Sequence, residues 1–562
     1  MNVSQLRREE SIKRIKEIRD FISHSAQDEN AGRLLTYLSE LEKEIKGKKY
    51  GLVFEEHREK IDETLEKNAP VLTEQEDLYI DNGGQMNFLI EGDNLAALQL
   101  LLKTHRGKID LIYIDPPYNT GNKDFIYDDD YVDKNDTFRH SKWISFMEKR
   151  LKLAKKLLSV NGCIFISIDD NESANLKLLC DEIFHENNFE GQIITVCNPG
   201  GRDYKQISLV HEYITSYSRT GRLTLNEIPK EIVFKLSDND GGYELRELRN
   251  RNPKFHSGNR PNLFYSFFVN PNSIDEYNCC AISLEKTATY NIEVKPYNSE
   301  GKESVWRWGK TKAQSAIVFD SPQSSQIVAK QKRDGGWNIY EKCRKSTTNV
   351  KSLWDETEMR TEDGTRLLRS IFGTSPFDHP KSLSLIYRCI LIASNPNSTI
   401  LDFFAGSGTT GHAVLKLNAE DGGTRRFILC TNNENNICRN ITYERIKRVI
   451  DKEDYAASLK YFKIDFVRIS ERLYYEYADE LLLHIRELVE LENGVNFRNN
   501  SEIAIVLTDE ELDAFMENRS ELKACRALYV GHDVLINGRQ SAALKRRKIA
   551  VNVIPQYYYE ES

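Results

Sequence analysis

The sequence predicts an α/β fold around a parallel sheet, interrupted by an insert of different character. From Phe88 onward, short apolar runs alternate with longer amphipathic stretches, a pattern typical of strands and helices that follow one another in a parallel sheet. Between about Arg219 and Thr347 this alternation is lost, and Gly, Pro, Asn, Tyr and Trp recur without a helical period. The alternation returns from Ser382, so two α/β parts are expected to flank an inserted domain.

Residues 1–80 are predicted to form a helical arm. Residues 4–68 are rich in Glu, Lys, Leu and Ile, with apolar side chains at helical spacing from Ile12 to Ile22 and from Leu34 to Ile45. Such an arm either buries a partner helix or caps the next domain.

The first α/β part is predicted to span residues 81–218. The segment Glu91-Gly92-Asp93-Asn94 precedes one helix, and Trp143–Leu158 forms another because its apolar residues share one face. The strand candidates are Phe88–Ile90, Ile109–Ile114, Gly162–Ile168, Ile193–Val196 and Glu212–Tyr217. The insert follows at residues 219–347.

The second α/β part is predicted at residues 348–470, and a small C-terminal α/β domain at residues 471–562. The helices expected in these two parts are Ser382–Ala393, Thr410–Leu417, Thr442–Ile450, Arg472–Leu491 and Asp509–Ala524. The strands expected are Ile400–Phe404, Phe427–Thr431, Ile503–Leu507 and Ile549–Ile554.

Composition narrows the class of protein. No apolar run approaches the roughly 20 residues of a membrane span, and the N-terminus does not resemble a secretory signal, so we expect a cytoplasmic protein without membrane contact. The 10 cysteines include no CxxC pair, which indicates neither a disulfide framework nor a structural zinc site. The net charge of the chain is -8, but it is unevenly distributed: residues 201–350 carry a net charge of +6 and residues 471–562 one of -6. A local phosphate-binding surface requires such a separation of positive from negative charge.

Two loops that follow predicted strands carry the candidate chemistry. In Phe404-Ala405-Gly406-Ser407-Gly408, the glycines let a ligand approach the backbone, and the next residues open a helix whose N–H groups suit a nucleoside or a carboxylate. In Asp115-Pro116-Pro117-Tyr118, the prolines lack N–H groups, so the loop offers acceptors for an amine beside a flat ring. In an open α/β sheet such loops share one crevice if their strands are neighbours.

These segments occur in an order that resembles a known family. The quoted pieces are Glu91 to Asn94, Asp115 to Gly121, Trp143 to Leu158, His211-Glu212-Tyr213, Phe377 to Ser382 and Asp402 to Thr410. Over roughly residues 86–466 the chain resembles the permuted class of amino-methylating DNA methyltransferases that use S-adenosylmethionine. The resemblance implies a Rossmann-like methyltransferase fold with an inserted target-recognition domain, and Asp115 in place of Ser favours adenine N6 over cytosine N4.

The resemblance also implies roles for individual residues. Asp115 and the Pro116 carbonyl, in a loop stiffened by Pro117, would accept hydrogen bonds from the adenine amine, and Tyr118 would stack on a base flipped out of duplex DNA. No metal is expected, because the cofactor supplies an activated methyl group. The cofactor contacts implied are Asp402, Phe404, Gly406 and Gly408, with Lys381 and Ser382 at the methionine end and Asp93 as a further candidate. Either Glu434 or one of the Asn residues 432, 433 and 435 would bind the ribose.

The insert combines basic and aromatic residues, the mixture expected for contacts to phosphates and bases of DNA. The residues predicted to face DNA are Arg251, Lys254, Arg260, Arg307 and Lys310.

The size of the chain, its arm and its C-terminal segment resemble the modification (Mod) subunits of type III restriction-modification systems. That resemblance implies a homodimer that methylates double-stranded DNA and binds an ATP-dependent restriction (Res) subunit. Three alternatives stay open: a solitary DNA adenine methyltransferase, a methyltransferase acting on RNA or a protein glutamine amide, and a DNA-recognition subunit with an idle catalytic centre.

Overall fold

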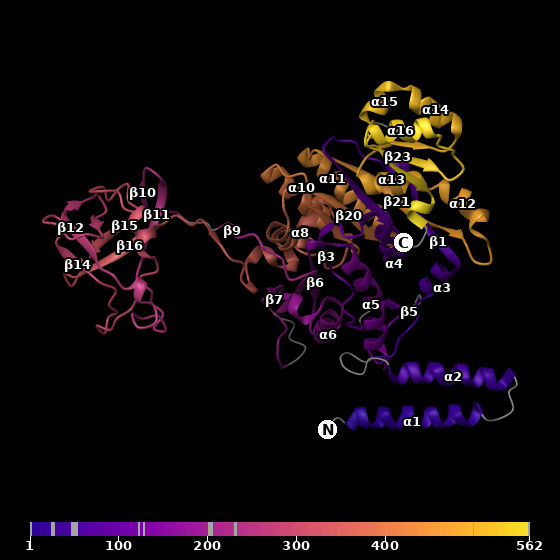
Figure 1. Ribbon diagram of the computed structural model, residues 1–562, viewed down its shortest axis with the longest axis horizontal. Coiled ribbons are helices and arrows are strands. Elements are labelled where there is room, and N and C mark those ends of the chain that lie inside the picture. The colour runs from indigo at the N-terminus through magenta and orange to yellow at the C-terminus, as the bar shows by residue number, and fades with distance from the viewer. Residues whose placement is uncertain are drawn as a thin grey trace. The chain divides into compact units, whose positions relative to one another are not determined.

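The computed structural model describes residues 3–23, 29–46, 54–121, 124–127, 130–200, 206–229, 233–497 and 500–559. The chain forms two compact units, the first made of Met1–Asn226 with Lys351–Ser562 and the second of Glu227–Val350 (Figure 1). The second unit overlaps the insert predicted at residues 219–347.

A ten-stranded sheet is the centre of the first unit. Its strands from β21 through β2, β20, β19 and β3 to β6 run parallel, whereas β1 and β8 pair antiparallel to their neighbours β21 and β6. In spatial order the strands are β1 (Asn68–Glu74), β21 (Ala457–Arg468), β2 (Gln85–Glu91), β20 (Arg426–Thr431), β19 (Thr399–Asp402), β3 (Ile109–Ile114), β6 (Leu158–Ile168), β8 (His211–Ser218), β7 (Phe189–Val196) and β18 (Leu353–Trp354).

Two groups of helices cover this sheet. One consists of α4 (Asn94–His105), α5 (Arg139–Leu157) and α6 (Ser173–Phe184), and the other of α8 (Thr361–Phe372), α9 (Leu383–Ala393), α10 (Thr409–Asp421) and α11 (Glu444–Glu453). Ile112 and Ile114 of β3 join Met147 and Leu151 of α5 in one buried cluster. The α/β fold predicted from the alternation of apolar runs is confirmed, and β3 has the bounds expected for it.

The N-terminal region is a helical hairpin followed by a strand. Helices α1 (Val3–Ser23) and α2 (Glu29–Lys46) pack together, with Arg19 paired to Glu42 at 3.0 Å, and α3 (Lys60–Lys67) follows. The predicted arm of residues 1–80 was wrong in its last part, because β1 belongs to the sheet. Strand β1 pairs antiparallel with β21, and its apolar residues Val71 and Leu72 are buried.

The C-terminal region adds a three-stranded parallel sheet of β22 (Ile503–Val506), β23 (Ala527–Gly531) and β24 (Ala550–Ile554). In this region, which was predicted as a small C-terminal α/β domain, Leu488, Tyr529 and Ile554 lie in the same buried cluster as the large sheet. The single helix expected at residues 472–491 is two helices. The helices here are α12 (Tyr474–Leu482), α13 (Ile485–Asn493), α14 (Asp509–Glu517), α15 (Arg519–Ala524), α16 (Gly538–Arg546) and α17 (Gln556–Tyr559).

The second unit is an antiparallel sheet with its own core, which includes Phe267 and Trp306. Its strands in spatial order are β10 (Leu236–Asp238), β11 (Gly241–Glu247), β16 (Trp337–Cys343), β15 (Ile327–Gln331), β13 (Cys279–Ser283), β12 (Phe267–Ile274) and β14 (Ile292–Val294). The remaining elements are β9 (Ile228–Pro229) paired with β17 (Thr347–Thr348), and α7 (Lys310–Ser315). In the first unit, β4 (Ile126–Tyr127) pairs with β5 (Asp130–Tyr131). No helix within the described ranges is long and apolar enough to cross a membrane.

A buried ion pair joins the C-terminal helices to the large sheet. The Nζ of Lys460 on β21 lies 2.5 Å from the Glu490 carboxylate on α13 and 3.0 Å from that of Glu74. We expect Lys460→Met to lower the free energy of unfolding by about 3–5 kcal/mol, since it leaves a fully buried carboxylate without its ammonium. Urea unfolding monitored by circular dichroism measures this loss.

The surface variant Lys452→Met is the control and should change the free energy of unfolding by no more than about 0.5 kcal/mol. The double variant Lys460→Met/Glu490→Leu should recover much of the loss. A separate unfolding transition for the C-terminal region would contradict a shared core.

Candidate active site

The two candidate loops meet at one edge of the sheet because their strands are neighbours. Strands β3 and β19 pair in parallel, with Leu111 opposite Ile400 and Ile112 opposite Leu401. The loops after these strands therefore emerge side by side at the carboxyl edge, where open α/β sheets bind ligands. The shared crevice expected for neighbouring strands is confirmed.

A pocket of about 1780 Å³ lies at this edge, and both loops line it. The sequence-predicted residues that line it are Asp93, Asp115, Pro116, Pro117, Tyr118, Lys381, Phe404, Gly406 and Glu434. Gly408 and Ser382 lie outside its lining, and Asp402 lines a smaller adjoining cavity.

The loop after β3 is fixed from the helix side. The indole Nε1 of buried Trp143 on α5 donates to the Pro117 carbonyl over 2.7 Å. Asn119, at φ +57°, donates to the buried Glu172 carboxylate over 2.5 Å. The loop is thus held with its Asp115 carboxylate and Tyr118 ring toward the pocket, and its prolines leave it rich in acceptors.

Lys381 joins this loop to strand β8. Its Nζ donates to Glu212 Oε2 and lies within 2.5 Å of the Tyr118 hydroxyl oxygen, and it is 3.4 Å from Asp115 Oδ1. The Tyr118 hydroxyl in turn donates to Glu212 Oε2 over 3.0 Å. One ammonium is therefore shared by two carboxylates and a phenol, so Lys381 contacts the loop after β3 directly.

The pKa values of the titratable groups in this cluster are shifted in different directions. Burial raises the pKa of Asp115, and the Lys381 ammonium only partly offsets this effect. Burial would raise the pKa of Glu212 too, but the Lys381 ammonium outweighs burial and lowers that pKa. Burial disfavours the charge on Lys381, yet Asp115 and Glu212 outweigh it and raise the pKa. Glu212 and Lys381 therefore form a stable ion pair, and Asp115 is the stronger base of the two carboxylates.

The glycine loop approaches the pocket with bare backbone. Gly406 has φ +48°, and a Cβ there would lie 3.2 Å from the Phe377 ring, so a side chain would crowd the loop. Gly408, at φ +75°, packs against Thr442, whose hydroxyl donates to the Gly406 carbonyl over 2.6 Å. Gly408 thus serves the turn into α10, and Gly406 is the glycine that faces the pocket.

Asp402, at the end of β19, holds the glycine loop from inside. Its carboxylate accepts the Phe404 N–H over 2.9 Å and the Thr410 hydroxyl over 2.5 Å. The side chain is buried, and burial raises its pKa to about 7, against the hydrogen bond from Thr410. Behind the loop, the buried guanidinium of Arg445 donates to the hydroxyls of Ser407 and Thr409.

Two other predicted cofactor residues are helix caps. Asp93 accepts the N–H groups of Leu95 and Ala96 at the start of α4 while it lines the pocket. Ser382 accepts the N–H of Leu385 at the start of α9 and donates to the Glu358 carbonyl. N-capping accounts for a Ser or Asp at both positions.

The residues after β20 line the pocket as a group. Asn432, Glu434 and Asn435 all border it, and Asn435 has φ +51° in the tight turn that follows β20. The acid and two of the three amides proposed for the ribose are thus at the pocket, whereas Asn433 lies outside its lining.

Sequence reasoning assigned no role to Glu212, Glu59 and Arg150, which all line the pocket. Glu212 lies in the quoted His211-Glu212-Tyr213 segment, so an acid at the start of a strand was the available signal. Arg150 lies in the quoted segment Trp143 to Leu158 and Glu59 lies in no quoted segment, so nothing local indicated that the two side chains pair.

The predicted DNA-facing residues differ in exposure and in whether they pair with an acid of the second unit. Arg307 pairs with Glu341 over 2.8 Å and donates to the Glu247 carbonyl over 2.6 Å, so its guanidinium is used inside the second unit. Arg251 is 79% exposed although it pairs with Glu247, and Lys254 is exposed. Arg260 lies over the Phe255 ring and Lys310 over the Tyr265 ring, both at 5.7 Å.

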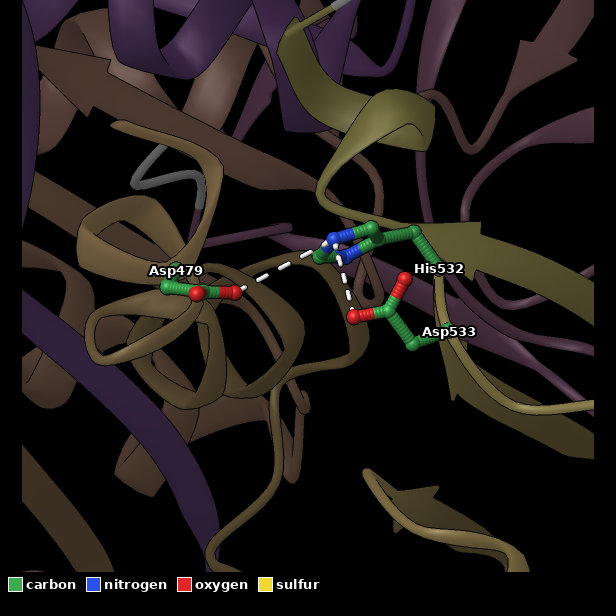
Figure 2. Close-up of side chains that lie close together, drawn as sticks. All are labelled: Asp479, His532 and Asp533. Atoms are coloured by element: carbon green, nitrogen blue, oxygen red, sulfur yellow. Dashed lines mark ion pairs between the residues drawn. The ribbon is translucent and has the colours of Figure 1, made fainter. Parts of the chain in front are cut away.

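One group within the described residues has ligand atoms close enough for a metal ion, and it does not line the pocket. Figure 2 shows this group, Asp479, His532 and Asp533. The carboxylates of Asp479 and Asp533 are 85% and 86% exposed, and they lie 4.0 and 3.5 Å from His532 Nε2. Exposed acids around one histidine are ordinary surface ion pairs.

Comparisons with known proteins show relatives that match about two thirds of the chain. A family model described as DNA methylase, N6_N4_Mtase, matches residues 109–444. The type II methyltransferase M.KpnI of Klebsiella pneumoniae is 35% identical over 389 residues, which is 67% of this chain and 90% of that protein. The EcoPI Mod subunit of Escherichia phage P1 and the StyLTI Mod subunit of Salmonella typhimurium are each 32% identical, and they align with 70% and 66% of this chain. These alignments span only 62% and 56% of the two Mod subunits.

The raised pKa of Asp402 predicts a pH-dependent stability. Since its pKa is about 7 in the folded chain and near 3.8 when unfolded, the folded state binds a proton that the unfolded state releases between these values. Stability from this group is present below about pH 4 and is lost as pH rises to about 7, at up to about 1.4 kcal/mol per pH unit.

We expect Asp402→Asn to flatten this dependence, as measured by thermal unfolding from pH 4 to pH 8. Asp465→Asn, at a partly buried acid of β21, is the control and should keep the wild-type slope. An unchanged slope in Asp402→Asn would show that Asp402 is ionised in the folded chain.

Proposed function

Because this chain belongs to the family of N6 or N4 DNA methylases, we propose that it transfers a methyl group from S-adenosylmethionine to adenine N6 in duplex DNA. The observation that carries the proposal is the pairing of β3 with β19, which brings the amine-binding loop and the glycine loop into one pocket. The corresponding fold is a Rossmann-like methyltransferase domain, with catalytic and cofactor-binding halves on either side of a target-recognition insert.

The pocket residues fit the cofactor by their chemistry. Gly406 offers backbone without a side chain, and Asn432 and Glu434 offer acceptors for ribose hydroxyls. Phe404 lines the same wall with an aromatic ring. When bound, S-adenosylmethionine supplies an activated methyl group, so the protein has to position the amine and take up one proton.

The DPPY loop would position the amine. Asp115 lines the pocket, and its buried Oδ1 has no hydrogen-bond donor apart from the Lys381 ion pair at 3.4 Å, so the carboxylate retains capacity to accept a hydrogen bond. With the Pro116 carbonyl accepting the second hydrogen, the amine nitrogen is drawn toward tetrahedral geometry, which frees its lone pair for attack on the methyl carbon. Tyr118 would stack on the flipped base. As the new N–C bond forms, the bond from the methyl carbon to sulfur would break and its electron pair would return to sulfur. The amine would then carry a surplus proton, and Asp115, whose pKa burial raises, is the carboxylate beside it.

The biological setting proposed is that of a type III modification subunit in the cytoplasm, forming a homodimer and binding an ATP-dependent Res subunit. The Mod relatives support it. One observation favours a second candidate, a methyltransferase without such a partner: the chain covers 90% of type II M.KpnI but less than two thirds of the two Mod subunits. Affinity purification from the native cell separates them, because only the first candidate brings down an ATP-dependent nuclease subunit.

Asp115→Ala should lower the rate of methyl transfer by about 10²–10⁴-fold, because it removes an acceptor of the amine and of its proton. Tritiated S-adenosylmethionine and duplex DNA measure the rate, and nucleoside analysis identifies the product. Asp355→Ala, at an exposed acid outside the pocket lining, is the matched control and should retain the wild-type rate.

N4-methylcytosine as the product would contradict adenine specificity. Label found only in RNA or protein would support the second enzyme class. DNA binding by the wild type without any transfer, in the presence of all subunits, would support an idle centre.

The second unit is proposed to recognise DNA through Arg251, Lys254, Arg260 and Lys310. Lys254→Ala and Arg260→Ala should each weaken binding and lower the slope of log affinity against log salt by about 1, the effect of one lost phosphate contact. Fluorescence anisotropy over a salt series measures both quantities. Lys332→Ala, at an exposed hairpin, is the control.

Arg307→Ala should instead destabilise the second unit, because Glu341 and the Glu247 carbonyl lose their donor. Unchanged salt slopes in Lys254→Ala and Arg260→Ala would remove these residues from the DNA-binding surface.

A further inference from the structure

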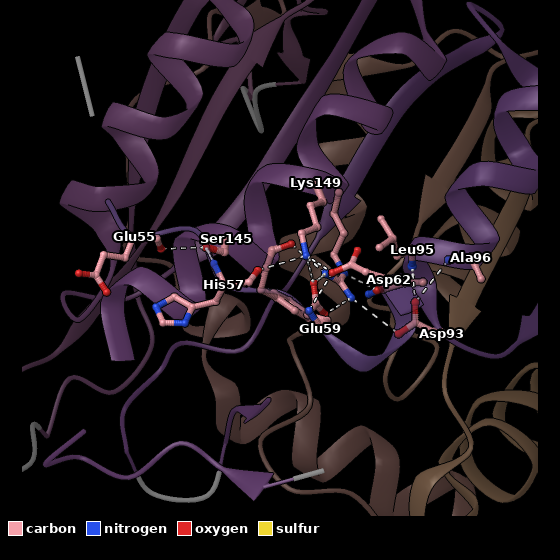
Figure 3. Close-up of polar contacts among 12 residues, drawn as sticks. Glu55, His57, Glu59, Asp62, Asp93, Leu95, Ala96, Ser145 and Lys149 are labelled. Carbon is pink, nitrogen blue, oxygen red and sulfur yellow. Dashed lines mark hydrogen bonds and ion pairs between the residues drawn. The ribbon is translucent and has the colours of Figure 1, made fainter. Parts of the chain in front are cut away.

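The segment that leads into α3 forms part of the pocket, although it belongs to none of the sequence motifs. Glu59, Lys60, Ile61 and Thr64 line the same cavity as the glycine loop and the turn at Gly92. Figure 3 shows the polar contacts of this segment with α5 and with the start of α4. A wall of the pocket therefore comes from chain that precedes the first predicted strand.

A single guanidinium anchors this wall. Arg150 on α5 is 1% exposed and donates through Nη1 and Nη2 to the two carboxylate oxygens of Glu59, over 2.9 and 3.0 Å. Its Nε donates to Asn94 Oδ1 over 2.5 Å, and its Cζ lies 3.6 Å from the centre of the Phe146 ring. Such a bidentate buried pair fixes direction as well as distance.

The same guanidinium reaches the glycine loop through two neighbours. Asn94 Nδ2 donates to the Phe403 carbonyl over 3.0 Å, and the Phe146 ring lies 5.9 Å from the Phe404 ring. Asp93 Oδ2 is 3.7 Å from Arg150 Nη2. Three walls of the pocket, at Glu59, Asp93 and Phe404, thus share one support.

The segment is also fastened along the length of α5. Ser145 Oγ accepts the His57 N–H over 3.0 Å and donates to the Glu55 carbonyl over 3.3 Å (Figure 3). Lys149 pairs with Asp62 and with Glu59. These bonds hold Ile61 and Thr64 at the pocket.

The position of the wall indicates which end of the cofactor it faces. The Gly92 N–H donates to the Thr431 carbonyl over 3.0 Å, so the turn that Arg150 supports lies beside the end of β20. Asn432 and Glu434, the ribose candidates, follow directly. Both Glu59 oxygens are already used by Arg150, which leaves the half-buried Ile61 as the apolar surface and Thr64 as the polar group facing a ligand.

We propose that residues 55–64 form a wall of the nucleoside end of the cofactor pocket, with Ile61 against the purine and the Glu59–Arg150 pair as positioning residues. The inference rests on the proposed function, because it takes the pocket ligand to be S-adenosylmethionine. Cofactor binding and the N-terminal region are then coupled, since the segment that follows the helical hairpin is part of the binding site.

The test measures binding of S-adenosylhomocysteine by titration calorimetry to the full chain and its variants. Glu59→Gln, Arg150→Met and Ile61→Ser should each raise the dissociation constant by about tenfold. The KM for S-adenosylmethionine should rise by a similar factor, whereas the KM for DNA should stay within about twofold of wild type, because the loop after β3 is untouched. Lys152→Met, on the exposed face of α5, is the matched control.

Hydrogen exchange gives a second measure that does not depend on a variant. Exchange of a peptide covering residues 54–67 should slow when S-adenosylhomocysteine binds the wild type. The double variant Glu59→Leu/Arg150→Met removes both charges of the pair, so neither is left buried without a partner. If this variant still binds S-adenosylhomocysteine weakly, the pair positions the wall. If it binds with wild-type affinity, the positioning role is wrong.

Wild-type affinity in folded Glu59→Gln and Ile61→Ser, with exchange of residues 54–67 unchanged by ligand, would overturn the inference and leave the proposed function intact. A wild type that does not bind S-adenosylhomocysteine at all would overturn both.

Discussion

The lateral pairing of β3 with β19 is the constraint on which the site depends. These strands come from opposite sides of the insert, and Asp110 of β3 bonds to both neighbouring strands: it accepts the Thr399 N–H of β19 over 3.0 Å and the Ser159 hydroxyl of β6 over 3.1 Å. A slip of one residue would turn every side chain to the other face of the sheet. Because the alignment is fixed, Asp115 and Phe404 line the same pocket.

The pocket has an ion pair at each of its two ends. Around the loop after β3, Lys381 and Glu212 neutralise one another, which leaves Asp115 as the carboxylate with capacity to accept a hydrogen bond. At the other end, Arg150 and Glu59 also form a closed pair, but their role is geometric. Buried ion pairs contribute little net stability when compared with apolar packing, so their presence at both ends is better explained by the orientation they impose.

Much of the fold could be predicted because the strands of a parallel sheet are short apolar runs, and the loops that follow them are marked by glycine or proline. The strand at Ile109–Ile114 and the loops after β3 and β19 are examples. The roles of Asp93 and Ser382 were harder, because an Asp or Ser before a helix is equally suited to capping and to binding a ligand. The Glu59–Arg150 pair could not be predicted at all, since neither side chain has a local pattern and only tertiary packing joins them. Strand β1 was missed because it follows directly on a helix.

The segments where the chain enters and leaves the second unit are bonded to one another, which makes the unit self-contained. Strands β9 and β17 pair at its two ends, and Glu227 bonds to both Lys345 and Thr347, so the unit closes upon itself where it leaves the first. Its buried core includes none of the residues that line the pocket. The second unit therefore keeps its core to itself, so substitutions inside that core should leave the packing around the pocket unchanged.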